Sequence, residues 1–107
     1  MDQLTEARIA RNQATFRDAN QRIVAAAGEI GVEPRAVPFI CECSELSCTR
    51  VLLIDLSEYT AVRRHPRRFL HAAGHEDPVG TTVEVHPNYV VVEKSGVAGE
   101  VAEDLAG

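Results

Sequence analysis

All three cysteines of the chain lie within eight residues, in the motif Cys41-Glu42-Cys43-Ser44-Glu45-Leu46-Ser47-Cys48. Each disulfide uses two thiols, so a disulfide framework would leave at least one of the three cysteines unpaired. A cation bound by thiolates accounts for the cluster better, because ligands that close around an ion replace part of the core that a small domain lacks. The motif therefore predicts a metal site.

The predicted site needs a fourth ligand, because structural zinc sites commonly use three cysteines with one histidine, or four cysteines. We expect His75 to complete it, since this residue follows Gly74 in a polar turn just after a predicted strand. His71, four residues earlier, is the alternative ligand. His65 lies among arginines and His86 precedes a Pro-Asn turn, so we expect both in solvent.

We predict Zn²⁺ as the bound cofactor. Cys41 and Cys43 fall on the same face of an ideal strand, with Glu42 opposite, but Cys48 joins them only if the segment between folds back. A [2Fe–2S] cluster is the alternative, because three Cys and one His can hold one and C-x-C openings occur in such sites. In the small CDGSH proteins, the nearest pattern, the third Cys and the His are close together, whereas 26 residues separate Cys48 from His75 here. Three ordinary reduced cysteines are the third interpretation.

The charge distribution limits the classes of molecule that the protein is expected to bind. Of the net charge of −5, residues 76–107 account for the whole excess, with seven acids against one lysine. This balance argues against general nucleic-acid binding, which needs a basic face. Four arginines nevertheless cluster: Arg63, Arg64, Arg67 and Arg68. They either contact an anion or phosphate, of RNA or of an acidic partner, or, as we favour, form a solvated face that the acidic C-terminal region offsets.

The expected location of the protein is inferred from its apolar segments, its N-terminus and its thiols. No stretch approaches the ~18 apolar residues of a membrane span. The N-terminus is acidic and polar, unlike a signal peptide. Clustered thiols without an export signal are typical of a reducing compartment, so we expect a cytoplasmic protein.

The elements that must position the ligands can be read from the spacing of apolar residues. A helix over 3–30 is expected to bury Ile9, Phe16, Ile23 and Ile30, with Arg17 among the residues on other faces. A heptad seam through Asn12, Ala19 and Ala26 would be weak, so we favour a helix packed on its own sheet over a dimer or partner helix and expect a monomer or a homodimer. The remaining expected elements are strands near 37–41, 50–56, 68–72, 80–85 and 89–94, and a short helix near 57–64.

The predicted fold is therefore of the α+β class. A long N-terminal helix packs on a small, mostly antiparallel sheet with one short inserted helix and a metal-bound hairpin tip. We expect one metal-binding domain over residues 1–95, with the sheet region at 37–94 and a loose acidic tail at 96–107.

The chain also resembles a family of small, mostly uncharacterised bacterial proteins over nearly its whole length up to residue 95. The resemblance implies a one-domain metal-binding fold and no particular substrate. The family pattern has Pro-Gly-His-Glu where this chain has Ala73-Gly74-His75-Glu76, which keeps the imidazole. The matching segments are 11–20 (RNQATFRDAN), 38–43 (PFICEC), Cys48-Thr49, Glu58-Tyr59 with Val62-Arg63, 66–69 (PRRF), 74–76 (GHE) and 89–94 (YVVVEK).

These features predict a non-enzymatic cytoplasmic zinc-binding protein that acts as an interaction or regulatory module with an unknown protein partner. The alternative is a thiol-based redox or metal sensor, built on zinc or on [2Fe–2S]. A small metalloenzyme is less favoured, because full ligation leaves no open position and no H-E-x-x-H helix is present. Its acid or base would come from Glu42, Glu45, Glu58 or Glu76.

Overall fold

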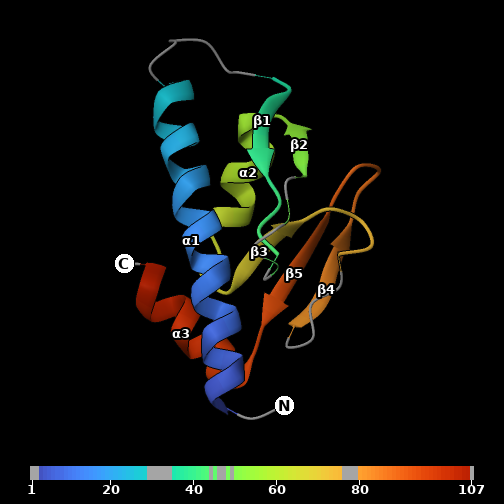
Figure 1. The fold of residues 1–107 in the computed structure, drawn as a ribbon. Coiled ribbons are helices and arrows are strands. Elements are labelled where there is room, and N and C mark those ends of the chain that lie inside the picture. The colour runs from blue at the N-terminus through green and yellow to red at the C-terminus, as the bar shows by residue number, and fades with distance from the viewer. Residues whose placement is uncertain are drawn as a thin grey trace.

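The structure is a computed structural model that describes residues 3–28, 35–43, 45, 48, 50–75 and 80–106. Within these residues a long helix, α1 (Gln3–Gly28), is followed by the shorter helices α2 (Leu56–Arg63) and α3 (Gly96–Ala106). The strands are β1 (Val37–Ile40), β2 (Val51–Ile54), β3 (Arg68–His71), β4 (Gly80–Val85) and β5 (Val90–Lys94). Every strand pair is antiparallel. The predicted α+β class, the long N-terminal helix and the short inserted helix are confirmed (Figure 1).

The strands form two small sheets instead of the single sheet that the sequence predicts. β1 pairs with β2 as a hairpin, and β5 lies between β3 and β4. The division falls at the cysteine loop. The amide of Cys41 still donates to Arg50 O across the hairpin at 3.0 Å, but the next amide, that of Glu42, donates to Leu70 O in β3 at 2.7 Å. Because the chain changes partner between consecutive residues, the hairpin tip is held against β3 while the two sheets stay separate.

Helix α1 buries a different face from the one that its large apolar residues predict. Ile9, Phe16 and Ile23 are only half-buried. Arg17, which the sequence places on another face, is fully buried and lies 5.0 Å from the centroid of the Phe69 ring. The buried positions are mostly small or polar, and they comprise Ala7, Ala10, Gln13, Ala14, Arg17, Asn20 and Ala27. Small side chains let a second element approach the helix closely, and that element is α3.

The expectation of a loose tail at 96–107 is wrong. Residues Gly96–Ala106 form helix α3, which packs beside the N-terminal half of α1 (Figure 1). Its buried face consists of the small residues Ala98, Gly99 and Ala102. A Cβ atom at Gly99 would lie 2.6 Å from the end of the flexible Arg67 side chain and 3.1 Å from Lys94 O, so a larger residue there would require Arg67 to move.

The main core lies between the β1–β2 hairpin, helix α2 and the three-stranded sheet. Two of the predicted metal ligands, Cys41 and Cys43, belong to it, and Tyr59 stacks on Phe39 with ring centroids 4.3 Å apart. The cysteine loop is thus anchored in the core at its start. Among the described residues, no helix combines the length and apolar character needed to cross a membrane.

Candidate metal centre

The structure brings Cys41, Cys43, Cys48 and His75 together. One ligand atom from each, a Sγ or an imidazole nitrogen, lies within 4.8 Å of all the others. The two cysteines at the start of the loop are buried, whereas Cys48 and His75 are half-buried. Soft thiolates with one imidazole are a donor set typical of protein zinc sites, so these four residues are positioned to bind a metal ion.

Two separate segments supply the ligands. The cysteines come from the tip of the β1–β2 hairpin, which the sequence predicts. The histidine comes from the turn after β3, where Gly74 adopts a φ of +86°, a conformation that residues with a Cβ rarely reach. The amide of His75 donates to Ala72 O at 3.1 Å and closes this turn. The glycine therefore aims the imidazole at the hairpin tip.

The distances from the imidazole fit a single tetrahedral ion. Nδ1 of His75 lies 3.6 Å from Sγ of Cys41 and 3.4 Å from Sγ of Cys48. Zinc–sulfur and zinc–nitrogen bonds of ordinary length, arranged as a tetrahedron, separate the two kinds of ligand atom by roughly 3.6 Å. The site thus has the dimensions of one ion with Nδ1 as the nitrogen ligand.

Burial controls the protonation of the thiols. It raises the pKa of Cys41 to about 12 and also raises the pKa of Cys43, because the interior disfavours a charged thiolate. A divalent cation offsets this cost, since a thiol that coordinates a cation is deprotonated. The amide of Ala72 already donates to Sγ of Cys41 at 3.2 Å, a contact that favours the thiolate form.

His71, the alternative ligand, lies behind the site and outside this group of four. Its Nδ1 donates to the carbonyl of His75 at 3.0 Å. Burial lowers the pKa of His71 to about 4, so the ring is neutral at pH 7 and is held in place by this hydrogen bond. His65 is exposed, as predicted. His86 is half-buried and stacks on the Tyr89 ring with centroids 4.3 Å apart.

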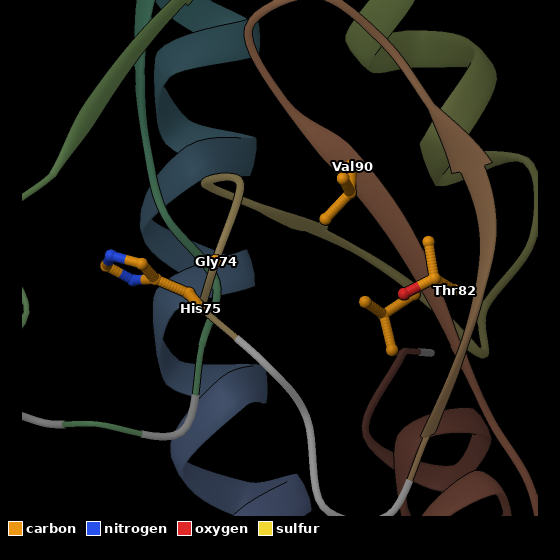
Figure 2. A pocket seen from close by; sticks show the side chains of 5 residues that line it. Gly74, His75, Thr82 and Val90 are labelled. Carbon is orange, nitrogen blue, oxygen red and sulfur yellow. The ribbon is translucent and has the colours of Figure 1, made fainter.

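A small pocket lies beside the site but faces away from the ligands. Its volume is about 130 Å³, and its lining consists of Gly74, His75, Thr82, Val90 and Val92. Figure 2 shows that the imidazole of His75 points away from the side chains of Thr82 and Val90. The pocket therefore borders the back of the histidine turn, on the side opposite the imidazole.

Glu42 lies in an environment that could not be foreseen from the sequence. It appears there as one of four acids suited to acid–base chemistry, but its side chain is fully buried and hydrogen-bonded to three other elements. The other acids differ: Glu45 is exposed, Glu58 accepts a hydrogen bond from Tyr89, and Glu76 lies outside the described residues. Alternation along the strand, which puts Glu42 opposite the cysteines, is the one signal that distinguishes it.

The arginine cluster at 63–68 pairs largely with acids of its own chain. The ion pairs are Arg63–Glu42 at 3.8 Å, Arg67–Glu103 at 2.6 Å, Arg68–Glu84 at 3.5 Å and Arg68–Glu93 at 3.1 Å. Three of these four acids belong to the acidic C-terminal region. The arrangement agrees with the interpretation in which the arginines are balanced within the molecule.

No match to the chain was found among protein families, curated proteins or solved structures. The resemblance to a bacterial family therefore stays a prediction.

Proposed function

We propose that the protein binds one Zn²⁺ through Cys41, Cys43, Cys48 and His75, and that it serves as a non-enzymatic interaction or regulatory module. The observation that supports this proposal most directly is the convergence of the four ligand atoms within 4.8 Å. The ion joins the hairpin tip to the turn after β3. Part of its binding free energy is then folding free energy.

The separations of the ligand atoms favour one ion over a [2Fe–2S] cluster. In a two-iron cluster, two ligands bind each iron, so ligands on different irons lie farther apart than the corners of one tetrahedron. Here the imidazole nitrogen is within 3.6 Å of two different sulfurs. Zinc is the metal that most often occupies a closed site of three cysteines and one histidine.

A structural role is also better supported than a catalytic one. Three thiolates and an imidazole complete a tetrahedron and leave no position for substrate or water. The pocket beside His75 lies on the far side of the imidazole. Glu42, the buried acid nearest the ligands in sequence, is engaged with several donors, so it does not serve as a free base.

Metal analysis of protein purified without oxygen or chelator tests the proposal. We expect one zinc per chain and no visible colour. Removing the metal should lower the melting temperature by more than about 10 °C, because the ion contributes several kcal/mol to folding. Added Zn²⁺ should restore it, whereas Mg²⁺ should not. A brown protein with iron and labile sulfide would contradict the zinc assignment, and equal melting temperatures with and without metal would contradict the structural role.

A thiol-based sensor is the second candidate, and the half-buried position of Cys48 favours it. Peroxide can take two electrons from two of these thiolates, forming one S–S bond while the peroxide is reduced to water. The ion would lose two ligands and leave. A sensor predicts zinc release at low peroxide and rebinding after reduction by a dithiol, whereas a purely structural site resists the same treatment.

A further inference from the structure

We propose that Glu42 is the positioning residue of the metal centre, and this inference rests on the proposed zinc site. Its buried carboxylate holds the cysteine loop and the His75 turn in register, so that the ligands are assembled before the ion arrives. Glu42 itself is not a ligand. It lies between two of the proposed ligands in sequence, yet its carboxylate contacts Asn20, Tyr59 and the amide of Leu70.

The Glu42 carboxylate is surrounded by donors from separate elements. Oε2 accepts from Nδ2 of Asn20 in α1 at 2.9 Å and from the hydroxyl of Tyr59 in α2. Oε1 accepts from the amide of Leu70 in β3 at 2.8 Å, and a guanidinium nitrogen of Arg63 lies 3.8 Å away. Burial raises the pKa of Tyr59, with the Glu42 charge adding to the effect, so the phenol stays protonated and donates. One residue thus ties the cysteine loop to two helices and a strand.

The same contacts fix the cysteine half of the site. Asn20, which donates to Glu42, also donates through Nδ2 to Ile40 O at 2.9 Å and accepts from the Ile40 amide at 2.9 Å. Asn20 therefore pairs with the last residue of β1 as a neighbouring strand would. Ile40 and Glu42 flank Cys41, so the backbone on both sides of the first ligand is held by one buried network.

The histidine half is fixed through Leu70. The Glu42 amide donates to Leu70 O at 2.7 Å, and the Leu70 amide donates back to the Glu42 carboxylate at 2.8 Å. The residues after Leu70 then reach the site directly. His71 donates to the carbonyl of His75 at 3.0 Å, and the Ala72 amide donates to Sγ of Cys41 at 3.2 Å. The two-way contact between Glu42 and Leu70 therefore sets the distance between the two groups of ligands.

This role requires a carboxylate. All the groups that face Glu42 are donors, and an ionised carboxylate is the side chain that only accepts. In Glu42→Gln, one oxygen becomes an NH₂ group that meets donors on at least one side. The change preserves size and burial but breaks the positioning contacts. Outer contacts that orient metal ligands typically change metal affinity by about 10- to 100-fold when they are removed.

The test compares Glu42→Gln with the wild-type chain and with Glu58→Gln as a matched control. Glu58 also accepts a hydrogen bond from a tyrosine, at 3.0 Å from Tyr89, but it is exposed. Zinc affinity is measured by competition with a chromogenic chelator, and the absorption spectrum of the Co²⁺-substituted protein reports the coordination geometry. We expect Glu42→Gln to bind zinc about 10- to 100-fold more weakly and to alter the cobalt spectrum. We expect the control to match wild type in both measurements.

The outcomes separate positioning from a general effect on stability. A purely structural role would lower the melting temperatures of the metal-free and the metal-loaded protein alike and leave the cobalt spectrum unchanged. A folded Glu42→Gln with wild-type affinity and spectrum overturns the inference while the proposed zinc site stands. Absence of metal binding by the wild-type chain overturns both.

A second variant covers the case in which Glu42→Gln does not fold. Tyr59→Phe removes one donor to the carboxylate but keeps the ring that stacks on Phe39. We expect it to fold and to bind zinc several-fold more weakly, with a shifted cobalt spectrum. Unchanged zinc affinity and an unchanged spectrum in this variant would overturn the inference as well.

Discussion

The sulfur of Cys48 lies 3.4 Å from Nδ1 of His75, although 26 residues lie between the two in sequence. This contact joins the end of the cysteine loop to the turn after β3. Glu42, at the start of the loop, is hydrogen-bonded to Leu70 in β3, the strand that leads to the histidine turn. The histidine is therefore a member of the site even though no local motif connects it to the cysteines.

Substituting this histidine should weaken metal binding strongly. Four ligands share roughly 10–16 kcal/mol of binding free energy in small structural zinc sites, so His75→Ala should reduce zinc affinity by roughly 100-fold. Chelator competition on the folded chain measures the loss. His65→Ala is the control, because His65 is exposed and lies outside the cluster. Equal affinities for the two variants would show that another group is the fourth ligand.

Arg17 should matter for stability without affecting the metal. Its guanidinium donates to Pro66 O at 2.9 Å and to Ala102 O at 3.1 Å, and it thereby links α1 to α3. Arg17→Met keeps an apolar side chain over Phe69 but leaves these carbonyls without that donor, so the free energy of unfolding should fall by about 2–4 kcal/mol.

Chemical denaturation of the zinc-loaded protein measures this change. Arg22→Met is the matched control, because Arg22 is exposed on the same helix, and we expect it to stay within about 0.5 kcal/mol of wild type. A similar stability for the two variants would show that the buried guanidinium contributes nothing net. Zinc affinity should be the same in both.

The four residues of the Cys/His group could be predicted from the sequence because the relevant chemistry is local. Thiols clustered within one short loop have few alternative roles, and a glycine before a histidine marks a turn that can aim the imidazole. The hairpin followed from two apolar runs on either side of that loop. These features need no knowledge of the partners that other elements provide.

The buried polar contacts of the fold and the C-terminal helix could not be predicted in the same way. Arg17 and Glu42 are buried because distant segments of the chain supply their hydrogen-bond partners. The residues next to them in sequence do not indicate which segments these are. Helix α3 could not be predicted for another reason: its buried face consists of Ala98, Gly99 and Ala102, and glycines at 96 and 99 argue locally against a helix. Burial of polar or very small residues is decided by tertiary packing.

Lys94 should give the stability of the protein a distinct pH dependence. The side chain is buried, with Nζ 5.7 Å from the centroid of the Phe69 ring, and burial lowers the pKa of Lys94 from 10.5 to about 7. Between these two values the unfolded chain binds the proton and the folded chain largely does not. The free energy of unfolding should therefore rise with pH over this range, by at most about 1.4 kcal/mol per pH unit.

Lys94→Met isolates this contribution, because every other titrating group is common to both proteins. Denaturant unfolding of each protein, reduced and metal-free, at several values from about pH 7 to about pH 10 gives two slopes. The difference between the two slopes reports the titration of Lys94, because the cysteines contribute equally to both slopes. We expect the variant to be the more stable protein near pH 7, where the wild-type chain loses a proton on folding, and the advantage to shrink as the pH rises. Parallel pH profiles would mean that the Lys94 amine keeps its ordinary pKa in the folded protein.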